Sequence, residues 1–484
     1  MITNLARKNK GKKNTNFRGY IKELASWSCI VLHKNKSFIS DYPDTERIQW
    51  VVDSGQYAEE KLENTKHGID YDFSLDFFTN FQNLFKKINL PNLYFEWENE
   101  NSDYASGIYF VKNAYLSFTV INWCENVLYS FSVKDYSNNV LNSVMVWNHS
   151  ENVYFCSWII KSFNVFYSRY IINSSNIYFS TNLVSCEECI FCDNLENQKY
   201  CIRNQKLEKD EYFRKKKEIL SEKKEFYKWF LSLNKIWKNI WSSNSTGNFI
   251  VNSEDISNAC FVYQAKNWRN LILSGWVNWL ENSYDMFLWW SPYAKNCYCV
   301  EASWWVENVY CSYSIWDSYE IYYSYFLENC SFCFWCVSLK NKNYCIFNKE
   351  YDKEEWHDLV EKIFRQMEVD WSLWKFFPSH INPFYFNDTL ASLILDFSKE
   401  EVTKDWYMRR DNQIKVDIPE NLEVINSKDL DIINYDEEIL KKVIKDESGN
   451  YYRITKMEYN FLKKHDLPLP EIHWLDRIKL GFKF

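Results

Sequence analysis

The chain has 484 residues, enough for two to four domains. It carries 57 Lys and Arg against 65 Asp and Glu, and this net charge of −8 excludes electrostatic nucleic-acid binding by the chain as a whole. No apolar run approaches the roughly 20 residues of a membrane-spanning helix, and the N-terminus lacks a signal peptide's apolar stretch. We therefore expect a cytoplasmic protein.

Residues 1–69 are expected to form a basic arm followed by a degenerate zinc-ribbon-like module. The arm carries Arg7, Lys8, Lys10, Lys12, Lys13 and Arg18. Two interpretations of the arm remain open: a solvated terminus, or a non-specific contact with the phosphates of a nucleic acid or an anionic lipid. Residues 70–112 are expected to be a helical connector, because Asp70, Asp72 and Asp76 supply an acidic helix start.

A short sequence motif, Asn followed by aliphatic or aromatic residues, recurs every twelve or thirteen positions; we call it the Asn motif. It begins at Asn113, Asn126, Asn139, Asn152, Asn164 and Asn176, with Glu188 in the next place. It returns at Asn258, Asn270, Ser283, Asn296, Asn308, Glu320 and Phe332. The unit is short and rich in strand-forming residues, and stacking buries the apolar side that one unit cannot bury alone. The sequence predicts a mainly β protein built on a parallel β-solenoid, with one or two units per coil.

The two arrays are copies of one another, which indicates a tandem duplication. An offset of 144 residues carries Asn152 onto Asn296 and Tyr200 onto Tyr344. We expect solenoid copies over residues 113–204 and 257–348. The recurring Asn is expected to form an amide ladder or to adopt positive φ at a corner; a ligand-facing role is the alternative.

Each array is followed by a charged segment with apolar residues at helical spacing. Residues 205–256 are expected to be a helical cap and linker, and residues 349–484 a C-terminal α+β module with a degenerate ribbon-like segment. The helices would shield the exposed edge of the last strand. We expect Phe226, Phe230, Leu359 and Ile363 to be buried against the adjoining solenoid ends.

Cysteine supplies the strongest candidate site. The same C-x-x-C-x-x-C pattern, followed by a fourth cysteine, occurs in both copies: Cys186, Cys189, Cys192 and Cys201, then Cys330, Cys333, Cys336 and Cys345. Four thiolates suit zinc or an iron–sulfur cluster. However, Cys189 and Cys201 are twelve positions apart, so they would stack as inward core residues of successive coils. We prefer inward packing for this pair; metal binding and a redox role are the alternatives, and Cys186 and Cys192 stay open.

Catalytic signatures are absent from the sequence. It has no Gly-rich phosphate loop, no H-E-x-x-H and no G-x-S-x-G. The seven histidines form no metal-ligand motif with a cysteine or carboxylate: His33, His67, His149, His357, His380, His465 and His473. We therefore expect no catalytic residues and no cofactor, unless the cysteines hold a metal.

Glycine is scarce and tryptophan abundant. The chain has 9 Gly and 23 Trp, whereas Gly averages about 7% of residues. Several Trp stand where a turn glycine would be expected, among them Trp289, Trp290, Trp304, Trp371 and Trp374. We hypothesise that some of these positions are encoded by UGA codons that mean glycine.

Several segments together resemble a family of proteins from small-genome bacteria. They are Asp70-Tyr71-Asp72-Phe73-Ser74, Phe376-Phe377-Pro378-Ser379, Asn382-Pro383-Phe384 and the stretch from Tyr452 to Pro470. The resemblance implies zinc-ribbon-like modules joined to Cys-rich repeats, and members often carry a CaiB/BaiF, CoA-transferase-like name. This chain departs from the family's metal pattern: Cys29 is the one cysteine of the first ribbon, and none follows Cys345.

Three functions follow from these observations. We expect a non-enzymatic scaffold that binds an unidentified macromolecule along the solenoid. The first alternative is a zinc or iron–sulfur protein that contacts RNA, with the basic arm as a further nucleic-acid contact. The second is an enzyme, either one with a solenoid groove or the CoA-transferase-like enzyme that the family label implies. No α/β pattern supports the CoA-transferase alternative.

Overall fold

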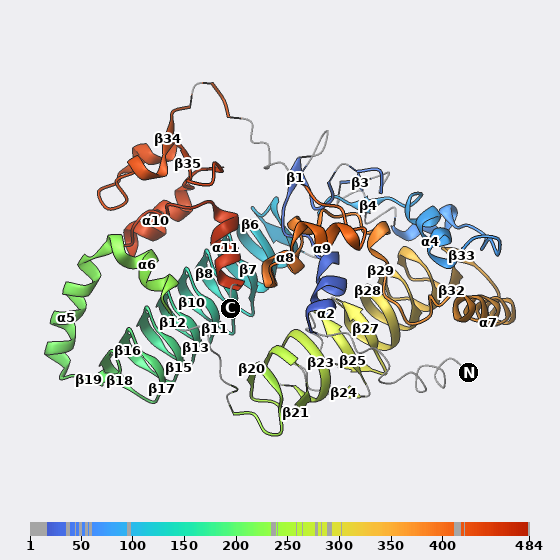
Figure 1. The fold of residues 1–484 in the computed structure, drawn as a ribbon, viewed down its shortest axis with the longest axis horizontal. Helices are drawn as coiled ribbons and strands as arrows, with labels where there is room; N and C mark the ends of the chain where they lie inside the picture. Colours follow the sequence, from blue (N-terminus) through green and yellow to red (C-terminus); the bar gives the residue numbers. More distant parts are fainter. Residues whose placement is uncertain are drawn as a thin grey trace. The chain divides into compact units, whose positions relative to one another are not determined.

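The computed structural model describes residues 17–34, 39–43, 45–47, 51–53, 57, 61–93, 98–233, 239, 241–257, 259–263, 265–275, 279–281, 283–287, 293–301, 303–410, 418–420 and 422–482. The chain divides into two compact units. The first comprises Met1–Asn92 and Lys238–Arg409, and the second Leu93–Trp237 and Arg410–Phe484. Each unit contains one β-solenoid (Figure 1).

The solenoid of the second unit is a row of short strands that follow one another along the stack (Figure 1). Its strands are β5 (Asn99–Glu100), β6 (Tyr104–Leu128), β7 (Phe131–Lys134), β8 (Asn138–Leu141), β9 (Val144–Trp147), β10 (Glu151–Tyr154), β11 (Ser157–Ile160), β12 (Phe163–Phe166), β13 (Arg169–Ile172), β14 (Ser175–Tyr178), β15 (Thr181–Val184), β16 (Glu187–Ile190), β17 (Asp193–Glu196), β18 (Lys199–Ile202) and β19 (Gln205–Lys206).

Each short strand pairs in parallel with the strand two places ahead, so one repeat unit forms one coil. Val153 of β10 lies opposite Val165 of β12, and Ile159 of β11 lies opposite Ile171 of β13. The predicted parallel solenoid is confirmed. These partners are twelve positions apart, the same step as the sequence repeat, which settles the number of units per coil at one.

A left-handed residue at every third position turns the backbone and so shapes each coil. From Asn113 to Asn204 every third residue has φ between 44° and 64°, and the extra residue of the longer coils is a second such residue at one corner. The residue after each turn points inward; Val153, Cys156 and Ile159 are all buried. Left-handed backbone costs about 1–2 kcal/mol for most residues and least for Gly, Asn and Asp. This conformational preference explains why Asn recurs at one corner.

The recurring Asn side chains form the expected amide ladder. Each Nδ2 donates to the Oδ1 of the next coil at 2.8–3.3 Å, through Asn101, Asn113, Asn126, Asn139, Asn152, Asn164 and Asn176. Their φ values are also positive, so both structural roles expected of this row are present together.

The solenoid of the second unit comes first along the chain, and we call it the first solenoid. Its two ends pair differently from its middle. β5 already pairs in parallel with β6, with Asn99 opposite Val111. The expected helical connector over residues 70–112 is therefore wrong in its second half, because these residues lack helical spacing and pair with the next coil. At the other end β19 turns back and pairs antiparallel with β18, which ends the parallel stack.

The solenoid of the first unit repeats this design. Its strands are β20 (Gly247–Val251), β21 (Glu254–Ser257), β22 (Ala259–Tyr263), β23 (Lys266–Gly275), β24 (Trp279–Glu281), β25 (Tyr284–Phe287), β26 (Tyr293–Lys295), β27 (Tyr298–Glu301), β28 (Trp304–Tyr322), β29 (Tyr325–Glu328), β30 (Ser331–Phe334), β31 (Val337–Lys340), β32 (Asn343–Ile346) and β33 (Lys349–Glu350). The offset that relates the two sequence copies carries β15 to β19 onto β29 to β33 with identical bounds. β20 lies inside the expected linker over 205–256 and β21 begins inside it, so this solenoid starts before residue 257.

Helices follow both solenoids, as expected, but they pack differently. α7 (Lys353–Val369) covers the last coil, and its Trp356 Nε1 donates to the carbonyl of Cys345 at 3.2 Å. Ile363 is buried, as expected. Leu359 is only half-buried, so the expected burial of Leu359 is wrong. After the first solenoid come α5 (Lys209–Ser221), η3 (Lys223–Glu225) and α6 (Phe226–Leu231).

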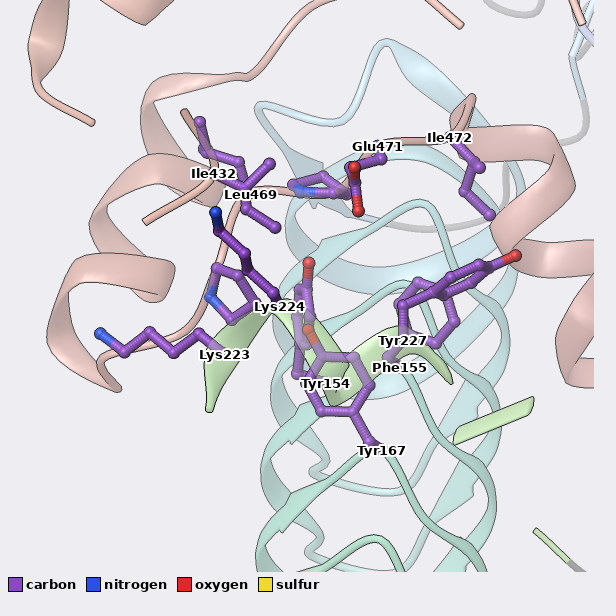
Figure 2. Close-up of a pocket in the computed structure, with 12 residues that line it drawn as sticks. Tyr154, Phe155, Tyr167, Lys223, Lys224, Tyr227, Ile432, Leu469, Glu471 and Ile472 are labelled. Atoms are coloured by element: carbon purple, nitrogen blue, oxygen red, sulfur yellow. The ribbon is translucent and has the colours of Figure 1, made fainter. Parts of the chain in front are cut away.

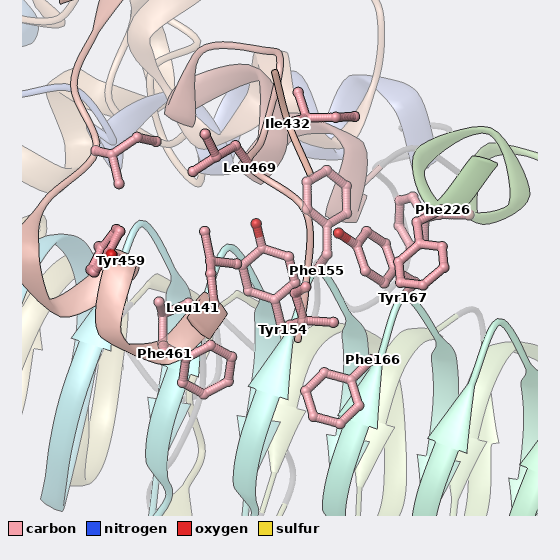
Figure 3. Close-up of a cluster of buried hydrophobic side chains, with 14 of the residues drawn as sticks. Leu141, Tyr154, Phe155, Phe166, Tyr167, Phe226, Ile432, Tyr459, Phe461 and Leu469 are labelled. Atoms are coloured by element: carbon pink, nitrogen blue, oxygen red, sulfur yellow. The ribbon is translucent and has the colours of Figure 1, made fainter. Parts of the chain in front are cut away.

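α6 lies on a side of the solenoid and not on its end. Phe226 and Phe230 are buried as expected, but they contact Tyr167 and Phe155 of the coils. These rings belong to a large aromatic cluster that also takes in C-terminal residues, such as Phe461 (Figure 3). We call this side of the first solenoid the aromatic face.

The expected C-terminal module over 349–484 is divided between the units. In the second unit the C-terminal residues form β34 (Val424–Asn426), η6 (Ser427–Asp429), η7 (Glu437–Lys441), β35 (Val443–Lys445), β36 (Tyr451–Tyr452), α10 (Lys456–Lys464) and α11 (Trp474–Phe482). α11 approaches β9 so closely that a Cβ on Gly481 would lie 2.4 Å from Val144 Cγ2.

The rest of the first unit is small elements around its own solenoid. They are α2 (Phe17–Leu24), η1 (Ala25–Trp27), β1 (His33–Lys34), β2 (Ile39–Ser40), β3 (Val51–Val52), η2 (Asn64–His67), α4 (Phe77–Phe85), β4 (Leu90–Pro91), η4 (Ser379–Ile381), η5 (Phe386–Asp388), α8 (Leu390–Ile394) and α9 (Lys399–Lys404). Within the described ranges, no helix has both the length and the apolar character needed to cross a bilayer.

Candidate functional site

The predicted cysteine sites lie inside the last coils of the two solenoids. Cys189 and Cys201 are register partners on β16 and β18, and Cys333 and Cys345 are partners on β30 and β32. All four are buried. Ile177 occupies the same column one coil before Cys189, and Ile321 does so before Cys333. The column is an apolar one that cysteine fills as a small hydrophobic residue.

Cys186 and Cys192 occupy a different kind of column, normally filled by serine. Ser174 Oγ accepts the backbone N–H of Cys186 at 2.9 Å, and Cys186 Sγ donates to the carbonyl of Val184. Cys192 repeats the arrangement: its N–H donates to Ser180 Oγ, and its Sγ accepts the N–H of Asn204 at 3.4 Å. Sulfur therefore replaces serine oxygen in two separate side-chain-to-backbone ladders, one that runs through Ser174 and Cys186 and one that runs through Ser180 and Cys192.

The second copy places its cysteines in the same way. The N–H groups of Cys330 and Cys336 donate to Ser318 Oγ and Ser324 Oγ, at 2.9 and 3.1 Å. The C-x-x-C-x-x-C pattern thus follows the three-residue period of the coil. Its outer cysteines lie in serine columns, and its middle cysteine lies in an apolar column.

Neighbouring thiols in each set also influence one another. A hydrogen bond with Cys189 lowers the pKa of Cys186, and hydrogen bonds with Cys333 and Cys336 lower the pKa of Cys345. Burial raises the pKa of Cys333 well above its usual value. Among the residues that the structure describes, no group of three or more His, Cys, Asp or Glu side chains is placed to hold a metal ion. Metal binding by these eight cysteines stays a prediction.

The two C-terminal histidines are held in their neutral form. Burial lowers the pKa of His473 to about 4, and Arg477 beside it acts in the same direction. Burial also lowers the pKa of His465 to about 4. Neither histidine is therefore a cation near neutral pH, which fits the structural role expected of them.

Cys29 of the expected first ribbon lies in an ordinary backbone pairing. It forms a β-bridge with Thr389, and its Sγ lies 3.5 Å from the carbonyl oxygen of Asp388. A zinc ribbon around Cys29 therefore finds no support in the described part of the chain.

A cleft in the second unit opens above the aromatic face (Figure 2). It encloses only about 20 Å³, room for about one water molecule. It is lined by Tyr154, Phe155, Tyr167, Lys223, Lys224, Tyr227, Ile432, Pro468, Leu469, Pro470, Glu471 and Ile472. The floor is aromatic, and Lys223, Lys224 and Glu471 supply the charged groups of its lining. Lys223 forms an ion pair with Asp466. The sequence did not reveal this cleft, because its walls come from segments that are far apart along the chain.

A second surface of this unit is polar and regular. Beside the amide ladder runs a column of residues from successive coils, namely Glu125, Asn138, Glu151, Phe163, Ser175, Glu187 and Lys199. Every member is exposed or half-buried. Phe163 is the one apolar residue in the column, and 43% of its surface is exposed. We call this side the ladder face.

Comparison with known proteins adds little to this geometry. No protein-family model matches the chain, and neither does any curated protein. One solved structure, described as a putative acetyltransferase from Desulfovibrio desulfuricans G20, covers 58% of this chain and 82% of its own, with 10% sequence identity. Its TM-score of 0.11 does not indicate a shared fold.

Proposed function

We propose that the protein is a non-enzymatic scaffold that binds a partner protein along the ladder face of its first solenoid. The observation that carries the proposal is the contrast between two sides of one solenoid. The aromatic face is covered by α6 and the C-terminal residues of the same chain, whereas every residue in the outer column of the ladder face remains accessible.

The chemistry of the ladder face favours a basic protein surface with an apolar anchor point. Glu125 and Glu151 lie on this face, Glu187 at its end is paired with Lys199 at 2.8 Å, and the chain as a whole carries a net charge of −8. Phe163 lies among these polar groups, and aromatic side chains, Phe included, are enriched at the buried centre of protein–protein interfaces. A solenoid presents such residues at the constant spacing of its coils, which suits an extended partner.

Site-specific cross-linking in lysate of the native cells tests this proposal. A photo-activated residue replaces Phe163 in the full chain, and the matched control replaces the exposed Glu196 on another side of the same solenoid. We expect one discrete protein adduct from position 163, strongly reduced by the double substitution Glu125→Lys and Glu151→Lys, and none from position 196. Equal adducts from both positions, or no adduct at all, would contradict the proposal.

The two alternatives make different predictions in the same experiment. A metalloprotein that contacts RNA would give RNA in the adduct. A CoA-transferase-like enzyme would show acyl-CoA turnover in the purified protein and no dependence on the ladder face.

A further inference from the structure

Tryptophans with high exposure share one backbone conformation. Among the described residues, the large exposed apolar side chains include five Trp: Trp123, Trp241, Trp305, Trp371 and Trp406. All five have positive φ, between 48° and 63°. A bulky side chain adopts this region at a cost, whereas glycine enters it freely.

Trp371 occupies a helix-ending position that glycine usually fills. α7 ends at Val369, and its C-cap Asp370 is followed by Trp371 with φ of 56°. The N–H of Ser372 donates to the carbonyl of Met367 at 3.0 Å, and the N–H of Trp371 donates to that of Glu368. These two bonds define a Schellman motif, whose left-handed residue is usually Gly. The indole is 80% exposed, so packing does not explain it.

Trp406 repeats the motif at the end of α9. Its φ is 63°, its N–H donates to the carbonyl of Thr403 at 3.1 Å, and the N–H of Tyr407 donates to that of Val402 at 3.3 Å. The side chain is 76% exposed. Two separate helices thus end in the same motif with a solvent-exposed Trp at the position that favours glycine.

Two buried tryptophans provide the internal contrast. Trp147 and Trp356 are almost completely buried, and neither has positive φ. The Nε1 of Trp147 donates to the carbonyl of Ser132 at 3.0 Å, and that of Trp356 donates to the carbonyl of Cys345 at 3.2 Å. These indoles are packed and hydrogen-bonded, as a true tryptophan requires.

Three further tryptophans combine positive φ with burial, and the inference does not extend to them. They are Trp158, Trp335 and Trp374. Trp335 packs edge-on against Phe81, with ring centroids 4.8 Å apart, and Trp374 packs in the same way against Tyr310 at 5.7 Å. Burial of a large ring offsets the cost of a left-handed backbone. A tryptophan position is therefore inferred to be glycine only where it combines a positive φ with an exposed side chain.

We infer that the five exposed left-handed positions, 123, 241, 305, 371 and 406, are glycine in the protein as its own cells make it. Each would be encoded by UGA, a codon translated as glycine there and written as tryptophan in the printed sequence. Positions 371 and 406 are the most informative, because they end helices, whereas left-handed residues of many types recur inside the solenoids. Glycine at about 7% of residues predicts about 34 in this chain, against the 9 present.

The structure thus narrows the set of positions that the sequence singled out. Trp371 meets both conditions. Trp304 lacks positive φ, and Trp374 is buried. Trp289 and Trp290 lie outside the described residues.

Glycine at these five positions changes the surface that a partner can contact. With glycine at these positions, the five exposed indoles disappear as docking points. The stack of Phe110 on Trp123, with ring centroids 4.6 Å apart, would not exist in the native protein. Phe163 of the ladder face is unaffected, because it is not a tryptophan.

The codons and the native protein test the inference together. We expect UGA at positions 371 and 406 and UGG at 147 and 356, and glycine at 371 and 406 in peptides of the natively expressed protein by mass spectrometry. In the printed chain, Trp371→Gly and Trp406→Gly should each raise the thermal midpoint by about 2–4 °C, whereas Trp147→Gly should lower it. UGG at 371 or 406, tryptophan in the native peptides, or a lowered midpoint for the two glycine variants would overturn it.

Discussion

Replacing Arg477 by Met is expected to destabilise the second unit by about 3–5 kcal/mol, because it leaves a buried carboxylate without its partner. Arg477 Nη1 lies 2.7 Å from Glu458 Oε1, and both side chains are completely buried. The same guanidinium donates to Asn142 Oδ1 at 3.1 Å, and thus joins α11 and α10 to the solenoid. Urea denaturation of the full chain, with hydrogen exchange measured on peptides of α10 and α11, measures the loss.

Lys479→Met on the same helix is the matched control. Lys479 is partly exposed and lies 3.6 Å from Asp476, an ion pair that is worth less than about 1 kcal/mol. Adding Glu458→Gln to the Arg477→Met variant should recover part of the loss, because it removes the unpaired charge. If Arg477→Met unfolds no more easily than Lys479→Met, the buried pair does not hold the C-terminal residues to the solenoid.

Replacing Phe226 by Ala is expected to cost a similar amount, about 3–5 kcal/mol, the range for truncating a fully buried aromatic residue. The ring is buried between Tyr167 and Phe179, with ring centroids 5.5 and 4.9 Å away. The cavity would open beneath α6, at the aromatic face (Figure 3). Hydrogen exchange should therefore accelerate in α6 and in the coils that carry Tyr167 and Phe179.

Leu231→Ala supplies the comparison within the same helix, because 41% of the Leu231 surface is exposed. Its loss of stability should be much the smaller of the two. Equal losses for the two variants would mean that α6 does not pack on the aromatic face as described.

The repeat made the solenoid predictable from sequence alone. The recurring Asn motif identified the coil. The offset that carries Asn152 onto Asn296 identified the second copy, and the last strands of the two copies have the same bounds once this offset is applied. The pairing of Cys189 with Cys201 follows from the same spacing. The serine columns were not anticipated, although the regular row of Ser162 and Ser174 before Cys186 signals one of them in hindsight.

Contacts between distant segments could not be predicted in this way. The C-terminal residues pack on the first solenoid through pairs such as Arg477 and Asn142, which are 335 residues apart. Such contacts depend on the fit of two finished surfaces, and no local spacing records them. The first coils of both solenoids were also missed, because β5, β20 and β21 depart from the Asn motif by which the arrays were recognised.

Exchanging cysteine for Val at two positions tests most directly whether the cysteines are packed parts of the coil. Cys189→Val should change the free energy of unfolding by less than about 1.5 kcal/mol, because valine fills the same apolar column in earlier coils, as at Val153 and Val165. Cys192→Val should cost about 1–3 kcal/mol, because it removes the acceptor of the Asn204 N–H. Neither value should change when a chelator is added. Equal losses for both variants, together with stoichiometric zinc or iron that chelation removes at the expense of stability, would contradict this account and establish the cysteines as metal ligands.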